Sequence, residues 1–181
     1  MKISKRNILA IIGSASKNSS NLKLVQKIAS ITQDYFDIKI FDGLSTLPHF
    51  DPELSVGDMP KIISDFRELI HKSNGVIICT PEYVFSIPGS LKNAIEWCVA
   101  TTVFSKKSVG LITASASGEK GHEELKLIMR TIEAVFTDDT TLLIKGIKGK
   151  ITESGNINDD RTSEQLTVFI AAFKKLVEDN N

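Results

Sequence analysis

The feature that most constrains the fold of this chain is a regular alternation between two kinds of apolar pattern. Short continuous runs rich in β-branched residues, each bounded by glycine, proline or small polar residues, predict strands at Asn7–Ile12, Ile38–Phe41, Gly75–Thr80, Ser108–Thr113 and Thr141–Ile144. Segments with a 3.6-residue apolar period lie between and after them and predict helices at Asn21–Gln33, Met59–His71, Pro88–Ala100, His122–Phe136 and Ser163–Val177. The chain therefore predicts five successive strand–helix units.

Continuous apolar strands indicate burial on both faces of the sheet, and helical crossovers indicate parallel strands. We therefore expect an α/β fold of three layers, with a doubly wound five-stranded parallel sheet between helices. The chain of 181 residues is 41% hydrophobic, enough to bury a core as a single domain over residues 1–181.

Charge and cysteine content limit the possible partners and compartments. Lysine plus arginine equals aspartate plus glutamate, at 22 each, so no overall field favours nucleic acid or an anionic membrane. No apolar run approaches the roughly 20 residues of a membrane span. Cys79 and Cys98 lie in apolar surroundings without metal or redox spacing, which is typical of reduced packing residues. We expect a cytoplasmic protein that binds neither nucleic acid nor membrane.

Two long connections depart from the short loops expected of such a fold. They are Asp42–Asp58, which contains the sequence LPHFDPEL, and Gly146–Asp160, which is rich in glycine, asparagine and charge. Loops of this length in a compact domain are usually functional or mobile.

Ligands of doubly wound sheets bind beyond the carboxyl ends of the strands, where the strand order reverses. The segment after the first strand, Gly13–Asn21, places hydroxyl and amide side chains before a helix N-terminus, an arrangement that suits a phosphate dianion. It has neither the Walker nor the dinucleotide glycine pattern, so we expect a mononucleotide phosphate. The structural alternative is that Ser19 or Ser20 only caps the helix.

Two further segments are expected to reach the same place. Pro81–Val84 forms a rigid turn that can direct backbone N–H groups and the ring of Tyr83 towards a flat heterocycle, although a plain strand–helix junction with Trp97 in the core is the alternative. Ser115–Gly121 again places small residues before a helix. In the strand order 2-1-3-4-5, the ends of the first, third and fourth strands are neighbours, and the three segments converge.

The remaining polar residues indicate no second site. The three histidines, His49, His71 and His122, have no metal-ligand spacing, and Glu96, Glu123 and Glu124 fit exposed helix faces. We therefore assign no catalytic side chain and no metal ligand.

The chain resembles the NADPH-dependent FMN reductases of the flavodoxin-like superfamily, which include quinone, azo-dye and chromate reductases. The family signature GSxRxxSxN is present from Gly13 to Asn21 with Ser16 in place of arginine. The signature TPEYNxSxPGxLKNAIDW is similar to Thr80–Trp97, with Val84 for asparagine and Glu96 for aspartate. The family's LPxFxPxL loop, which borders the substrate entrance, looks like Leu47–Leu54. The resemblance extends from Gly13 to about Val135.

The resemblance implies a flavodoxin-like fold, bound FMN, and NADPH or NADH as electron donor. Hydride would pass through flavin N5 to a quinone, azo compound, metal oxyanion or free flavin. Either Lys17 would supply the charge that Ser16 lacks, or the phosphate would rest on neutral donors, and a homodimer or homotetramer is expected. The implied FMN-binding residues are Ser14, Ser16, Lys17, Ser19, Ser20, Asn21, Pro81, Glu82, Tyr83, Val84, Ser115, Ala116, Ser117 and Gly118. The alternatives are a flavodoxin-type electron carrier and a flavin-free binding module on the same fold.

Overall fold

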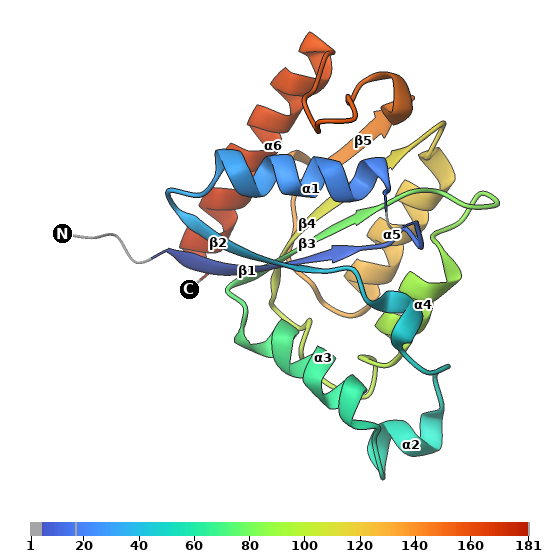
Figure 1. Ribbon diagram of the computed structural model, residues 1–181. Coiled ribbons are helices and arrows are strands. Elements are labelled where there is room, and N and C mark those ends of the chain that lie inside the picture. The colour runs from blue at the N-terminus through green and yellow to red at the C-terminus, as the bar shows by residue number, and fades with distance from the viewer. Residues whose placement is uncertain (1–4, 17, 181) are drawn as a thin grey trace.

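The computed structural model describes residues 5–16 and 18–180, and it contains a five-stranded parallel sheet covered by helices on both faces (Figure 1). The strand order is β2-β1-β3-β4-β5, so the predicted fold class and strand order are confirmed. The strands are β1 (Arg6–Ile12), β2 (Phe36–Phe41), β3 (Gly75–Thr80), β4 (Ser108–Ser115) and β5 (Thr141–Lys145).

The helices form the two outer layers. α1 and α6 pack on one face of the sheet, and α3, α4 and α5 pack on the other (Figure 1). The helices are α1 (Ser20–Ile31), α2 (Pro52–Val56), α3 (Lys61–Lys72), α4 (Gly89–Glu96), α5 (Glu119–Thr131) and α6 (Asp160–Asp179).

The continuous apolar runs supply two cores at once, because successive side chains of a strand point to opposite faces. In β1, Ile8, Ala10 and Ile12 join the core under α1 and α6, whereas Leu9 and Ile11 join the core under α3, α4 and α5. Every residue of β3 is buried. These central strands therefore show the two-sided burial predicted from their sequence.

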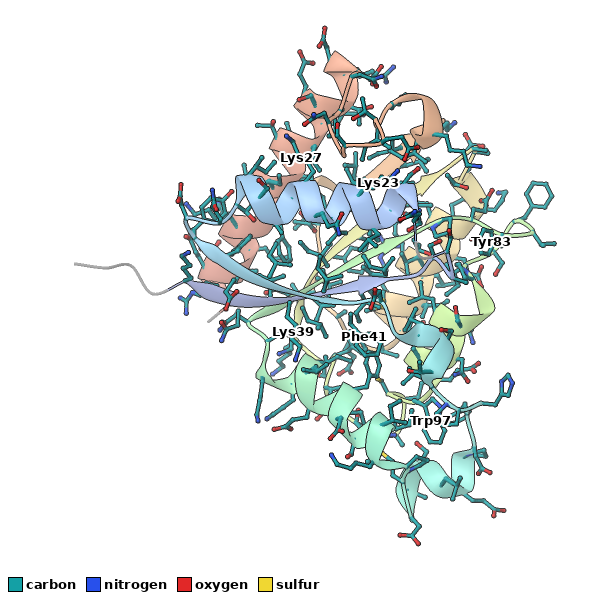
Figure 2. The ribbon with its side chains drawn as sticks, in the orientation of Figure 1. Lys23, Lys27, Lys39, Phe41, Tyr83 and Trp97 are labelled. Carbon is teal, nitrogen blue, oxygen red and sulfur yellow. The ribbon has the colours of Figure 1, made fainter. Side chains whose placement is uncertain are left out.

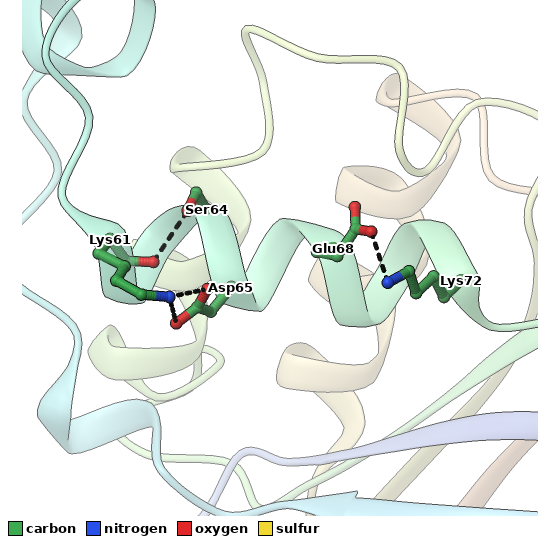
Figure 3. A network of polar contacts seen from close by, with 5 residues as sticks. All are labelled: Lys61, Ser64, Asp65, Glu68 and Lys72. Carbon is green, nitrogen blue, oxygen red and sulfur yellow. Dashed lines mark hydrogen bonds and ion pairs between the residues drawn. The ribbon is translucent and has the colours of Figure 1, made fainter.

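The outer surface of α3 is stabilised locally. Lys61 Nζ lies 2.7 Å from Asp65 Oδ1, and Lys72 Nζ lies 2.9 Å from Glu68 Oε1, both at i,i+4 spacing (Figure 3). Exposed pairs of this kind contribute about 0.3–0.5 kcal/mol each. Burial of Ile63, Phe66 and Ile70 on the other side of the helix therefore contributes far more to its stability.

Several helix boundaries differ from the sequence prediction. α4 begins at Gly89, after Pro88, and ends at Glu96 rather than at residue 100. α5 covers Glu119–Thr131 rather than 122–136, because Val135 forms backbone hydrogen bonds with Lys107 and Val109 beside β4. The long loop after β2 contains the short helix α2, where Asp51 accepts hydrogen bonds from the first-turn amides of Glu53 and Leu54. Such tertiary and capping contacts override the apolar period at helix ends.

None of the helices within residues 5–16 and 18–180 has both the length and the apolar character needed to cross a lipid bilayer.

Candidate functional site

A cavity of about 660 Å³ lies at the carboxyl ends of β1, β3, β4 and β5, within the size range of small-molecule sites. It brings together the three segments predicted to converge, and a fourth segment after β5. The described residues that line it are Ser14, Ser16, Asn18, Ser19, Ser20, Asn21, Pro81, Tyr83, Ala114, Ser115, Ala116, Gly146, Ile147, Lys148 and Gly149.

Gly13 allows the first segment to lie directly against the end of β3. Its N–H donates to the carbonyl of Cys79 at 2.8 Å. A Cβ atom at this position would lie 2.3 Å from Thr80 Oγ1 and 3.1 Å from its Cα, which no side chain can tolerate. Only glycine therefore brings the turn after β1 so close to Thr80 at the end of β3, and this explains the glycine at the start of the motif.

The start of α1 is fixed by side chains of the same segment. Ser19 Oγ accepts a hydrogen bond from the Leu22 amide at 3.1 Å, so the predicted capping role is present alongside its place in the cavity wall. The Asn21 amide donates to the Ala114 carbonyl at 3.2 Å, and Asn21 Oδ1 accepts from the Cys79 thiol at 3.3 Å. Asn21 thus ties the helix start to β3 and β4.

The turn after β3 is a two-residue hairpin. Tyr83 and Ser86 exchange backbone hydrogen bonds of 2.9 and 3.0 Å, and Val84 and Phe85 between them have φ values of 52° and 59°. These left-handed conformations cost energy in residues with bulky side chains. Val84 is 95% exposed and Phe85 is 77% exposed, so the tip of the turn lies in solvent. Figure 2 shows Tyr83 at the base of this projecting turn.

Two carboxylates attach this turn to α5. Glu82 Oε1 accepts from the Gly118 amide at 3.2 Å, and Glu82 Oε2 accepts from the Gly121 amide at 2.7 Å. Glu124 Oε2 accepts from the Ile87 amide at 3.2 Å. A negative charge at the first turn of a helix is favourable, because the free N–H groups and the helix dipole are positive there. Glu82 therefore fixes the spacing between the segments that follow β3 and β4.

The fourth wall was not predicted from the sequence. Gly146, in the left-handed region at φ 66°, donates to the carbonyls of Ser115 and Ala116 at 2.8 and 3.1 Å. It thereby brings Ile147 and Lys148 to the cavity. The signal was available in the glycine-rich loop Gly146–Asp160, because β5 adjoins β4 and its carboxyl end lies at the same edge.

The predicted binding residues fall into three groups. Nine line the cavity: Ser14, Ser16, Ser19, Ser20, Asn21, Pro81, Tyr83, Ser115 and Ala116. Four lie beside it without lining it: Glu82, Val84, Ser117 and Gly118. Lys17 lies outside the described residues.

The titratable groups near the site are mostly structural. Burial raises the pKa of the Cys79 thiol far above its usual range and that of Cys98 to about 12, and both thiols are free. Burial, followed by the charge of Lys126, lowers the pKa of His122 to about 4, with its Nδ1 at 2.9 Å from Thr113 Oγ1. No group of three or more potential metal ligands occurs in the part of the chain that the structure describes.

Asn93 and Trp97, from the signature at Thr80–Trp97, hold the segment after β2 against α4. The Pro48 carbonyl accepts hydrogen bonds from Asn93 Nδ2 at 2.9 Å and from Trp97 Nε1 at 2.8 Å, and the Phe50 amide donates to Asn93 Oδ1 at 2.7 Å. The rings of Phe50 and Trp97 meet edge to face at 5.4 Å. The asparagine and tryptophan of LKNAIEW therefore fix the LPHFDPEL loop.

Comparisons with known proteins agree with this geometry. The family model for NADPH-dependent FMN reductase matches residues 6–148. A quinone reductase of Escherichia coli is 25% identical over 96% of both chains, and a 2-hydroxy-1,4-benzoquinone reductase of Burkholderia is 27% identical over 95% of this chain and 96% of its own. The NAD(P)H:(acceptor) oxidoreductase FerB of Paracoccus denitrificans has a similar fold, with a TM-score of 0.79, 22% identity, and coverage of 97% of this chain and 98% of its own.

The family match contains the three predicted ligand segments and the start of the fourth, and the curated relatives extend over almost the whole chain. The chain belongs to the NADPH-dependent FMN reductase family and is an oxidoreductase that works with FMN and NAD(P)H.

Proposed function

We propose that this chain binds FMN in the cavity at the carboxyl edge of the sheet and reduces quinone-type acceptors with electrons from NAD(P)H. The observation that carries the proposal is the convergence of the segments after β1, β3 and β4 on one cavity. Each segment contributes a different chemistry, and together they match the parts of a phosphorylated flavin.

The phosphate end of the ligand has suitable donors. Ser14, Ser16, Asn18 and Ser20 line the cavity beside the first turn of α1, whose leading N–H groups have no partner within the helix. Hydroxyl, amide and helix N-terminal N–H groups together form an anion site. None of the described lining residues carries a carboxylate that would repel a phosphate.

The ring end has a flatter and less polar lining. Pro81, Tyr83, Ala114 and Ala116 surround this part of the cavity, and Tyr83 is half-exposed. When bound, FMN supplies the redox chemistry, because its N5 accepts a hydride from the nicotinamide and releases it to the acceptor. Pro81 and Tyr83 would orient the ring, and a side of the ring left open to solvent would allow donor and acceptor to bind in turn.

The acceptor class follows from the relatives. Proteins described as quinone reductases or as a benzoquinone reductase are similar to this chain over nearly its full length. A planar quinone can stack on a flavin ring that is accessible from the solvent side. Azo compounds, metal oxyanions and free flavin are the further acceptors to compare.

We further propose that the chain acts as one domain in the cytoplasm and assembles as a homodimer or homotetramer. The exposed apolar tip of the turn, Val84 and Phe85, supports assembly, since large apolar side chains beside a site are commonly covered by another molecule. Sedimentation of the FMN-loaded protein tests this part.

The activity test measures oxidation of NADPH and NADH by the FMN-loaded protein with benzoquinone, an azo dye, chromate and FMN as acceptors. We expect turnover that depends on bound FMN and is fastest with the quinone. The chain has two tyrosines, which provide a matched pair of variants. Tyr83→Ala should weaken FMN binding and lower turnover, whereas Tyr35→Ala, at the amino end of β2, should leave FMN affinity unchanged. Quinone reduction without FMN, or none with it, would contradict the proposal.

A further inference from the structure

We propose that Lys148, in the segment between β5 and α6, supplies the positive charge that holds the phosphate of the flavin. The inference rests on the proposed function and assigns a binding role to a segment outside the family's two sequence signatures. It answers a question raised by the sequence, where Ser16 stands at the position of the family arginine.

The charge of the cavity wall points to this lysine. Of the described residues that line the cavity, Lys148 alone carries a formal charge. The others contribute hydroxyls, amides, backbone groups and apolar side chains. A phosphate dianion in this cavity would therefore meet one cation among the described lining residues.

Lys148 is also available for a ligand, in contrast to its neighbours on the same segment. Lys145 pairs with Glu119, and Lys150 Nζ lies 3.5 Å from Asp159 Oδ2. Lys148 makes no ion pair with any described residue. In the sequence KGIKGK, Lys145 and Lys150 are thus paired with carboxylates of the protein, and Lys148 remains available for an anion.

The backbone around Lys148 is well fixed. Gly146 is bound to the carbonyls of Ser115 and Ala116, and the Gly149 amide donates to the Gly146 carbonyl at 3.0 Å. Between them, the Ile147 side chain is buried in the core under α1 and α6. This short 3₁₀ turn, Ile147–Gly149, therefore places the flexible lysine side chain at the cavity from a rigid base.

The segment lies on the side of the cavity where a phosphate would bind. Asn18 lines the main cavity and also a second groove between α1 and residues 153–156. In that groove, Lys23 Nζ lies 2.7 Å from Glu153 Oε2, so the segment after β5 runs beside the start of α1 (Figure 1). Lys23 and Lys27 lie along α1 in Figure 2 and line that groove rather than the main cavity. Lys148 thus lines the same cavity as Ser19, Ser20 and Asn21 at the helix N-terminus that suits an anion.

A lysine at this position would act differently from the arginine of the family signature. Its ammonium group is a point charge on a flexible stem, whereas a guanidinium grips a phosphate with two parallel hydrogen bonds. Ser16 has an uncharged hydroxyl and cannot form these two parallel hydrogen bonds. Its backbone amide already donates to Ser14 Oγ at 3.2 Å. The phosphate would then rest on the helix start and hydroxyl donors, with Lys148 neutralising part of its charge.

The test compares FMN with riboflavin, which has the same ring and lacks the phosphate. Dissociation constants are measured by flavin fluorescence for the wild-type chain, Lys148→Gln, Lys148→Arg and the control Lys150→Gln, which removes a lysine of the same segment outside the cavity. We expect Lys148→Gln to weaken FMN binding about tenfold, equivalent to about 1.4 kcal/mol, because the substitution removes the positive charge that faces the phosphate. Its riboflavin affinity should stay within about twofold of wild type. Lys148→Arg should restore FMN binding, and Lys150→Gln should change neither ligand.

Lys17→Gln provides the competing assignment. A phosphate-selective loss in Lys17→Gln, with none in Lys148→Gln, would overturn the inference and leave the proposed function intact. Equal losses of FMN and riboflavin in Lys148→Gln would also overturn it, because they would indicate a change in shape rather than in charge. A wild-type chain that binds neither flavin would refute the proposed function itself.

Discussion

The segments after β2 and β3 lie at the same edge of the sheet but are built in opposite ways. The segment after β2 is held by side-chain hydrogen bonds from two helix regions: Trp97 and Asn93 donate to the Pro48 carbonyl, and the buried Arg67 donates to Ser55 Oγ. The turn after β3 presents two apolar residues to solvent in left-handed conformations, and its attachments lie at its base. The first segment carries stability, and the second carries exposed, strained surface beside the ligand cavity.

This difference indicates that the segment after β2 serves stability and that the turn after β3 serves ligand binding. Strained backbone persists only where surrounding contacts enforce it, and it tends to collect at functional sites. Here Glu82 and Glu124 enforce the turn through α5, whereas Asn93, Trp97 and Arg67 hold the segment after β2. Variants of Trp97 and Arg67, which hold the segment after β2, should therefore change the free energy of unfolding. Variants in the turn after β3 should change flavin binding.

The largest effect is expected from Trp97→Ala. Trp97 is fully buried, contacts Phe50 and donates to the Pro48 carbonyl. Its removal should lower the free energy of unfolding by about 3–5 kcal/mol, as measured by urea denaturation. Trp97→Phe keeps most of the apolar volume and should cost less. FMN affinity of the folded protein should change little, and a large loss of affinity with unchanged stability would break the comparison.

Arg67→Met should produce the next largest loss of stability. The buried Arg67 guanidinium donates to the carbonyls of Trp97 and Ser55 and to Ser55 Oγ at 2.8 Å. Methionine fills part of the space but leaves these acceptors without a donor, and we expect a total loss of about 2–3 kcal/mol, since a buried group left unsatisfied costs about 1–3 kcal/mol. The exposed Arg161, changed to Met, serves as control and should leave the urea midpoint unchanged.

Glu82→Gln sharpens the comparison from the other side. The substitution retains shape but removes the negative charge, and the glutamine N–H₂ would face an amide donor. We expect a loss of about 1 kcal/mol in stability and a clear rise in the FMN dissociation constant, because the spacing of two cavity walls depends on this side chain. Glu123→Gln, on the exposed surface of α5, should change neither the stability nor the FMN dissociation constant. Unchanged flavin binding in Glu82→Gln would show that the turn is positioned by other contacts.

His122, which lies in α5, gives the stability of the protein a pH dependence. Its folded pKa of about 4 lies below the ordinary histidine value of 6.5, so the unfolded chain binds the proton more readily. The stability from neutral His122 is therefore complete above about pH 6.5 and is lost as the pH falls towards 4. The ring resonances of His122 in NMR spectra should titrate with a midpoint near this low value, and His122→Gln should flatten the fall in stability over that range. A midpoint near 6.5 would contradict the burial.

The smallest expected effect is a gain. Val84→Asn places a residue that tolerates the left-handed region where φ is 52°, and it should stabilise the protein by about 1 kcal/mol. Val168→Asn, at an exposed position in the helical backbone of α6, should give no such gain. Stabilisation of both variants would indicate that exposure, rather than backbone strain, causes the effect.

The sequence predicted the sheet and its ligand edge because these follow from local patterns. Continuous apolar runs specify buried parallel strands, and the residues at their carboxyl ends can be identified from the chain alone. The fourth wall, by contrast, depends on how Gly146 meets the carbonyls after β4, which is a contact between distant segments. Glu124 resembled an exposed helix residue because its bond to the Ile87 amide depends on the fold of the turn.

The role of Glu82 could not be predicted for the same reason. Its place in the motif beside Pro81 and Tyr83 indicated a position in the cavity wall, but its carboxylate binds the start of α5. Helix ends were likewise predicted less well than strands, since capping and tertiary hydrogen bonds set them.

The most direct test of the account is an amide NMR titration of the wild-type chain with FMN. The account predicts saturable binding with the largest shifts confined to four segments, residues 14–21, 81–87, 115–118 and 146–149, and little change in the groove beside Lys23 and Lys27. Shifts concentrated outside those four segments, or the absence of binding, would contradict it.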